Sequence, residues 1–83
     1  MAYDPNDYRA NPGKYRLFRT ATIARATVTG DGETLEPGET VGVAFRCEAY
    51  NALRRRSEPV YAITRVDGYT FDGYGSILSG FVL

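Results

Sequence analysis

The sequence predicts a mostly β protein: a small antiparallel β-barrel or rolled sheet of five to six strands, with a short helical turn at the N-terminus. Two observations indicate this class. Residues 40–49 alternate between apolar side chains and small or charged ones, which is the period of a half-buried strand. Other short runs rich in β-branched and aromatic residues follow at regular spacing, and Gly, Pro and Asp separate them as they do in turns.

The length of the chain sets its domain organisation. Its 83 residues can build one hydrophobic core and not two. We expect residues 1–13 to form a polar N-terminal extension with a short helical turn, and residues 14–83 to form a single small β domain.

The N-terminal extension carries the signals of a helix start. Asp4 can cap the helix, Pro5 suits the first helical position, and Asp7 favours the positive end of the helix dipole. Asn11-Pro12-Gly13 ends the helix. The sequence therefore predicts one helical turn over Pro5–Ala10.

The run from Lys14 to Thr29 alternates in strand fashion. Its Thr and Val content favours strands over the competing helix. The run is too long for one ordinary strand. We expect two strands, or one bent strand with a β-bulge near residues 20–22, and then a turn over residues 30–34.

The strand over residues 40–49 is expected at the centre of the sheet. It should pair as a hairpin with the strand over residues 60–66, which Pro59 opens. Three arginines then lie near the hairpin tip. Cys47 shares the apolar parity of Val41 and Phe45, so we expect its side chain to be buried.

Residues 67–83 are predicted to form two further strands. Asp67-Gly68 is a strong hairpin signal and leads into a strand over residues 69–71. Residues 72–75 are expected to turn again, and residues 76–83 to form a final strand tied into the sheet. Phe81 and Leu83 share one parity of that strand, so both are expected to be buried.

The acidic turn over residues 35–41, Leu-Glu-Pro-Gly-Glu-Thr-Val, resembles the loop that enters a strand in SH3-like small barrels. Pro and Gly at its centre have the chemistry of a tight turn. The resemblance covers seven residues and implies an SH3-like fold alone, because one fold hosts many functions.

Composition excludes several environments and partners. Ten basic and ten acidic residues balance, so no overall field attracts nucleic acid or an anionic membrane. Cys47 is the only cysteine, which excludes an intramolecular disulfide and favours a reducing compartment. Residues 1–7 do not read as a signal peptide, and no apolar run could span a bilayer. We expect a cytoplasmic protein that does not enter a membrane.

Composition also weighs against catalysis. The chain has no histidine, which is the commonest general base and metal ligand. Cys47 therefore has no His partner, and the carboxylates over residues 31–39 lack the spacing of a calcium loop. The sequence predicts a non-enzymatic protein with no catalytic residue, no metal site and no cofactor.

Two features are candidate binding sites. Three consecutive arginines at the hairpin tip, with tyrosines on both sides, could bind phosphates or carboxylates, or could simply keep the loop soluble. The repeated Asp-Gly-Tyr at residues 67–69 and 72–74 could present tyrosines for stacking or protein contact. Turn chemistry, with the tyrosines covering the edge of the core, is the favoured explanation of this repeat. The predicted binding residues are Arg54, Arg55, Arg56, Tyr50, Tyr61, Tyr69 and Tyr74.

We predict a small binding module that acts through protein–protein surface contacts, like the small inhibitors and adaptors encoded by phages and other mobile elements. This analogy rests on size and class. The alternative is a nucleic-acid-binding small β-barrel that uses the Arg54–Arg56 loop, although the neutral charge weighs against it. A third alternative is a structural protein whose edge strands pair between copies, for example as a homodimer.

Overall fold

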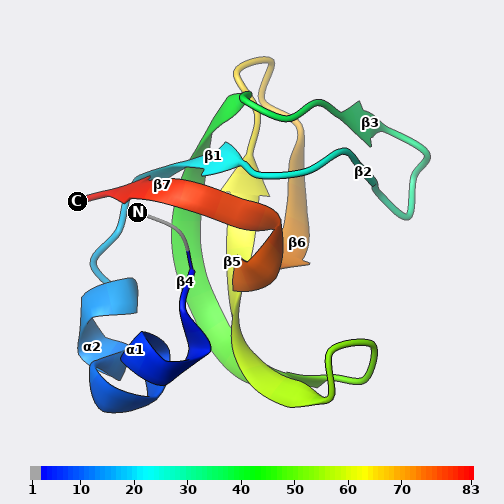
Figure 1. Cartoon of the computed structure of the whole chain (residues 1–83). Helices are drawn as coiled ribbons and strands as arrows, with labels where there is room; N and C mark the ends of the chain where they lie inside the picture. The colour runs from blue at the N-terminus through cyan, green and yellow to red at the C-terminus, as the bar shows by residue number, and fades with distance from the viewer. Residues whose placement is uncertain (1–2) are drawn as a thin grey trace.

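A five-stranded antiparallel sheet forms the body of the molecule, with a small two-stranded sheet beside it and two short helices before it (Figure 1). The structure is a computed structural model and describes residues 3–83, so Met1 and Ala2 of the predicted extension lie outside the described residues. The elements in chain order are α1 (Pro5–Ala10), α2 (Pro12–Tyr15), β1 (Thr20–Ile23), β2 (Thr27–Val28), β3 (Thr34–Leu35), β4 (Thr40–Asn51), β5 (Arg56–Thr64), β6 (Thr70–Tyr74), the 3-10 helix η1 (Gly75–Ile77) and β7 (Leu78–Val82).

The strand order of the larger sheet is β6-β5-β4-β1-β7. Every neighbouring pair is antiparallel. β4 bends along its length and is the longest ribbon in Figure 1. Within residues 3–83 the edge strands β6 and β7 do not pair with each other, so the sheet is not a closed barrel.

Helix α1 has the predicted bounds, and its cap explains why. The carboxylate of Asp4 accepts a hydrogen bond from the backbone N–H of Asn6 at 2.9 Å, which satisfies one of the free donors of the first turn. Pro5 stands at the first helical position, where its missing N–H costs no hydrogen bond. The prediction of a helical turn over Pro5–Ala10 is confirmed.

The predicted start of the β region at Lys14 is wrong. Pro12 opens a second helical turn, α2, and the first strand begins at Thr20. Tyr15 explains this outcome, because its ring is fully buried and its hydroxyl donates to Asp7 Oδ2 at 2.9 Å. This contact with α1 outweighs the strand-like alternation of the neighbouring residues. The two strands expected before Gly30 are present as β1 and β2.

The alternative to two strands is one bent strand with a bulge near residues 20–22, and the irregularity found there belongs to the partner strand β7. The register between β1 and β7 shifts between Thr20 and Thr22, and the additional residue lies in β7. Gly80 has φ +57°, a backbone conformation that glycine adopts without a steric cost. Phe81 is buried as expected. Leu83 follows the end of β7 at Val82 and is 72% exposed, so the prediction that Leu83 is buried is wrong.

The hairpin of β4 and β5 is confirmed, but its register departs from simple alternation. A β-bulge lies between Phe45, which pairs with Tyr61, and Cys47, which pairs with Val60. Residues directly opposite each other in a sheet share a face. Cys47 therefore lies on the face of Val60, away from the buried Tyr61, and its side chain is exposed. The prediction that Cys47 is buried is wrong because the bulge moves it to the other face.

Asp67-Gly68 makes the predicted turn between β5 and β6. The N–H of Gly68 donates to the carbonyl of Arg65 at 2.9 Å, and Gly68 has φ +93°. The second predicted turn, over residues 72–75, is wrong, because β6 continues to Tyr74. Gly73 serves close packing there: a Cβ at this position would lie 2.8 Å from Ile63 Cδ1. Because Gly73 has no side chain, the side chains of neighbouring residues can approach its backbone closely in the middle of the strand.

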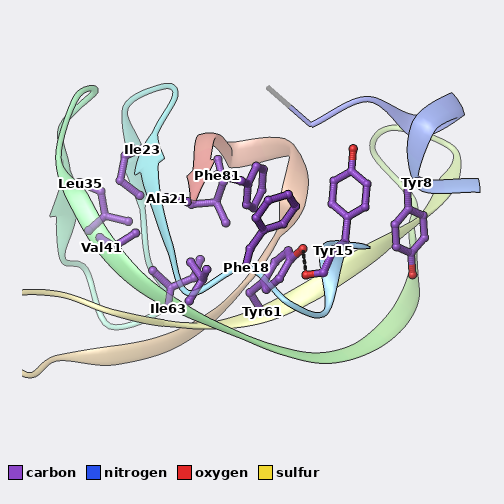
Figure 2. Close-up of a cluster of buried hydrophobic side chains, with 12 residues drawn as sticks. Tyr8, Tyr15, Phe18, Ala21, Ile23, Leu35, Val41, Tyr61, Ile63 and Phe81 are labelled. Atoms are coloured by element: carbon purple, nitrogen blue, oxygen red, sulfur yellow. Dashed lines mark hydrogen bonds between the residues drawn. The ribbon is translucent and has the colours of Figure 1, made fainter. Parts of the chain in front are cut away.

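The core lies on one side of the sheet (Figure 2). The aromatic rings of the core pack against one another mostly edge to face. The ring centroids of Tyr15 and Phe18, for example, are 5.5 Å apart and their planes make an angle of 78°. The hydroxyl of Tyr61 donates to the carbonyl of Tyr15 at 2.9 Å, which fixes α2 to the sheet. The aliphatic part of the core consists of Ala21, Ile23, Leu35, Val41, Val43, Ile63 and Leu78.

Candidate binding site

The structure separates the predicted binding residues. The three arginines and Tyr50 lie at or near the tip of the β4–β5 hairpin, and the hydroxyl of Tyr74 reaches this region by donating to the carbonyl of Tyr50 at 3.1 Å. Tyr69 lies at the other end of the sheet, beside the β2–β3 hairpin. Tyr61 is fully buried in the core, so its side chain cannot take part in a surface site.

Arg54 belongs to a buried polar cluster around Glu58. The side chain of Glu58 has no solvent exposure, and its carboxylate accepts hydrogen bonds from Asn51 Nδ2 at 3.0 Å and from the backbone N–H of Ser76 at 3.1 Å. Arg54 Nε lies 3.5 Å from Glu58 Oε2, outside hydrogen-bonding geometry. Because a buried carboxylate needs such partners, we assign Arg54 a structural role beside Glu58, whose carboxylate binds the backbone of η1.

Arg55 has a different role, because its backbone presents its side chain to solvent. Its φ is +55°, and it is the one non-glycine residue among residues 3–83 with a positive φ. The left-handed conformation costs roughly 1–2 kcal/mol for such a residue. Strain of this kind is often found where a loop serves a function.

A groove of about 470 Å³ lies between the β4–β5 loop and the N-terminal helices. Arg55 and Arg56 line it from the hairpin, and Arg9 lines it from α1. Tyr8 and Pro12 add apolar surface from the helices, and Glu48 adds a carboxylate from β4. The fold therefore brings an arginine of the N-terminal extension to the same groove as two arginines of the hairpin.

The charges in this groove are not balanced internally. Among residues 3–83, the ion pairs do not include Arg9, Arg55 or Arg56. Glu48 Oε2 accepts a hydrogen bond from the hydroxyl of Tyr8 at 2.9 Å. Burial and this bond raise the pKa of Tyr8 to about 12, so its hydroxyl keeps its proton above the pH at which a free tyrosine titrates. The groove can therefore accept an anionic group, because guanidinium groups bind carboxylates and phosphates in a bidentate manner.

Arg9 was not among the residues that the sequence predicts for the site. The sequence places it in the last turn of α1, where a basic residue suits the helix dipole. No local signal connects residue 9 with residues 55 and 56. Only the docking of α1 against β4, through Tyr8 and Glu48, puts it beside the hairpin.

Tyr69 helps to hold two hairpins together. Its hydroxyl donates to Asp31 Oδ2 at 3.0 Å and lies 3.0 Å from Thr29 Oγ1, and its ring stacks on Phe71 with centroids 5.8 Å apart. A second groove, of about 390 Å³, runs from this point between the β2–β3 hairpin and β6. Tyr74 lines the same groove, so the two tyrosines of the Asp-Gly-Tyr repeat share one surface that is separate from the arginine groove.

Comparison with known proteins finds no family, no curated protein and no solved structure that matches this chain. Within residues 3–83, no group of three or more His, Cys, Asp or Glu side chains is placed to hold a metal ion. No helix in this part of the chain has the length and apolar character needed to cross a membrane.

Proposed function

We propose that the protein is a non-enzymatic binding module that holds an acidic segment of another protein in the groove between α1 and the β4–β5 loop. The observation that supports this proposal is the meeting of Arg9, Arg55 and Arg56 in one groove without an internal ion pair. Such arginines are available to carboxylates of a partner. Tyr8 and Pro12 supply apolar contact beside them, and Arg and Tyr are enriched at protein interfaces.

The experiment compares capture of partners by the unaltered protein and by variants of the groove. Arg55→Ser with Arg56→Ser removes two of the free cations and leaves the buried Arg54–Glu58 cluster intact. Arg19→Ser is the matched control, because Arg19 is exposed and does not line the groove. Quantitative mass spectrometry of proteins captured from host lysate should show partners that the unaltered protein and the control retain and the double variant loses.

The strength of the effect follows from the contacts removed. A hydrogen bond to a charged group contributes about 1.5–3 kcal/mol, so loss of one arginine contact should weaken binding about tenfold or more. The binding should also weaken as salt concentration rises. A double variant that keeps full affinity for every captured protein would contradict the proposal and leave the loop as solubilising surface.

Nucleic acid is the second candidate ligand. The same three arginines could contact phosphates, and Tyr50 is exposed beside the loop, where a base could stack on its ring. The neutral net charge and the carboxylate of Glu48 in the groove make this the weaker candidate. Retention on heparin at about 150 mM salt, together with anisotropy of a labelled single-stranded oligonucleotide, separates the two functions. Tight retention that Arg55→Ser with Arg56→Ser abolishes would favour nucleic acid.

We further propose that the fold is an open variant of the SH3-like small barrel. The turn that resembles the strand-entering loop of such barrels does lead into β4, with Gly38 at φ +91°. Five antiparallel strands around one core also fit this proposal. An experimental structure tests it: superposition of all five strands on an SH3-like barrel would support the proposal, and a different strand order would contradict it.

A further inference from the structure

Strand β6 is an edge strand with a regular, unpaired side. It pairs with β5 over five consecutive residue pairs without a shift in register. No other strand within residues 3–83 pairs with it. The opposite edge of the sheet, β7, is interrupted by the bulge at Gly80. Bulges are a common means of preventing pairing at an edge, and β6 lacks one.

The hydrogen-bond pattern shows which backbone groups of β6 are free. The N–H of Arg65 donates to the carbonyl of Tyr69 at 2.8 Å, next to the turn. Antiparallel pairs alternate between hydrogen-bonded and non-hydrogen-bonded, so Phe71 and Gly73 direct their backbone groups toward β5. The backbone N–H and C=O groups that face the open edge are those of Thr70, Asp72 and Tyr74.

An apolar groove runs beside this edge. It is the groove of about 390 Å³ that separates β6 from the β2–β3 hairpin. Phe71 and Ile77 line it, and both are partly buried hydrophobic residues that pack against the core. Five strand residues span about 17 Å, so the edge has the length for one short extended segment.

We propose that β6 binds an extended segment of another protein as an additional antiparallel or parallel strand. Backbone hydrogen bonds to Thr70, Asp72 and Tyr74 hold the segment, and every second side chain enters the groove over Phe71 and Ile77. This is recognition by strand addition, in which main-chain bonds supply affinity and alternate side chains supply specificity. The proposal is independent of the arginine groove.

Charge selects the outward side chains of the bound segment. Asp72 lies on the outer face of β6 with its side chain 55% exposed, and Asp31 lines the same groove. Opposite charges that face each other across two strands are favourable. The pair between Asp72 and Arg46 is 3.5 Å long and more than half exposed on both sides, so it competes weakly. We therefore expect apolar residues facing inward and a Lys or Arg beside Asp72.

The same charge argues against a second copy of this chain as the occupant. Two copies of β6 paired about a two-fold axis at Asp72 would place the two Asp72 carboxylates opposite each other. Like charges directly opposite each other destabilise a strand pair. A different sequence, with a basic residue at that position, avoids this repulsion.

The test uses labelled, end-capped heptapeptides in which Val alternates with Lys, and it follows their fluorescence anisotropy with the full chain. Two N-methylated versions carry the methyl groups on alternate edges of the peptide. We expect one N-methylated version to bind like the parent and the other to lose at least about tenfold in affinity, because only one edge bonds to β6. A Glu/Val peptide should bind more weakly than the Lys/Val peptide.

Substitutions in β6 test whether the peptide binds at this edge. Asp72→Pro removes the outward N–H without breaking a bond to β5, and it should weaken binding about tenfold. Asp72→Asn keeps the N–H and should remove only the preference for Lys over Glu. Arg55→Ser with Arg56→Ser should leave peptide affinity unchanged, which separates this site from the arginine groove.

Three outcomes would overturn the proposal. One is equal affinity of both N-methylated peptides, and another is no binding by any peptide at millimolar concentration. The third is a dimer or larger assembly in sedimentation that Asp72→Pro dissociates, since the edge would then serve a second copy. Should Asp72→Pro fail to fold, the contrast between the two N-methylated peptides still tests the proposal.

Discussion

Glu58 shows how one buried carboxylate determines which arginines of the loop can be replaced without loss of stability. It is fully buried between Asn51, Ser76 and Arg54, and none of these contacts is evident from its place in the sequence. Among the ion pairs of residues 3–83, Arg54 is the one cation that pairs with this carboxylate. Arg54 and Arg55, although adjacent, should therefore respond very differently to substitution.

Arg54→Ser should lower the free energy of unfolding by about 1–3 kcal/mol, because it leaves a buried carboxylate with one fewer partner. Arg55→Ser should change it by less than about 0.5 kcal/mol, because Arg55 is exposed. Urea denaturation of both variants measures the difference. Equal midpoints would show that the contact between Arg54 and Glu58 contributes nothing to stability.

Cys47 tests the β-bulge of β4 directly. Because the bulge moves its thiol to the exposed face, a thiol reagent should label the native protein nearly as fast as the protein in urea. The rates are measured by absorbance after addition of an aromatic disulfide. Labelling that is slower by a factor of about 100 or more in the native state would place Cys47 in the core and remove the bulge.

At the scale of elements, β7 contributes a core position, and the residue that follows the strand is exposed. Phe81 is 6% exposed and contacts Phe18 with ring centroids 5.0 Å apart, whereas Leu83 follows the end of the strand and is 72% exposed. The backbone of this strand is also tied to the chain before β1, because the N–H of Arg19 donates to the carbonyl of Val82 at 2.8 Å. The stability that the C-terminus contributes should therefore come from residues up to Val82.

Phe81→Ala should destabilise the protein by about 3–5 kcal/mol, the usual cost of removing a buried aromatic ring. Leu83→Ala, or deletion of Leu83, should change the free energy of unfolding by less than about 0.5 kcal/mol. Thermal melts of the two variants side by side measure this contrast. A large loss of stability from Leu83→Ala would mean that this residue is covered in solution.

At the scale of the whole molecule, four tyrosines join the N-terminal helices to the sheet. Tyr3 packs against the rings of Tyr8 and Tyr15, and Tyr15 bonds through its carbonyl to the hydroxyl of Tyr61. Burial raises the pKa of Tyr3, Tyr8 and Tyr15 to about 12 and raises that of Tyr61 as well. Tyr3 and Tyr8 of the N-terminal extension thus pack with the core, and their raised pKa values link the stability of the fold to alkaline pH.

We expect stability to fall as the pH rises from about 10 to 12. In this range the unfolded chain releases its tyrosine protons while the folded chain keeps them, so each such tyrosine lowers the free energy of unfolding by at most about 1.4 kcal/mol per pH unit. Below pH 10 both states hold these protons, and this contribution is constant. Urea midpoints across pH 9–12 measure the slope.

Tyr8→Phe is the control for this pH dependence, because it removes one of the raised groups and keeps the ring. The slope of stability against pH above 10 should become shallower in this variant. An unchanged slope would show that burial and the bond to Glu48 do not raise the pKa of Tyr8 in the folded state.

Local sequence determined the elements whose signals lie within a few residues. Asp4 and Pro5 define the start of α1, Asp67-Gly68 defines the β5–β6 turn, and the alternation of residues 40–49 defines the central strand. Each signal acts through the backbone of its own neighbourhood, by a cap, a positive φ or a side-chain period. The sequence also identified the loop of arginines as a candidate binding site, but it did not predict that Arg9 lies across the groove from this loop.

Tertiary structure decided what depends on pairing between distant segments. The bulge between Phe45 and Cys47 arises from the register between β4 and β5, and it reversed the expected position of Cys47. Leu83 is exposed because β7 ends at Val82. Gly73 reads as a turn residue, but its role comes from Ile63 on the neighbouring strand. Arg9 joins the arginine groove only because α1 docks on β4. A register or a docking contact depends on atoms far apart in the chain, and no local pattern of residues contains that information.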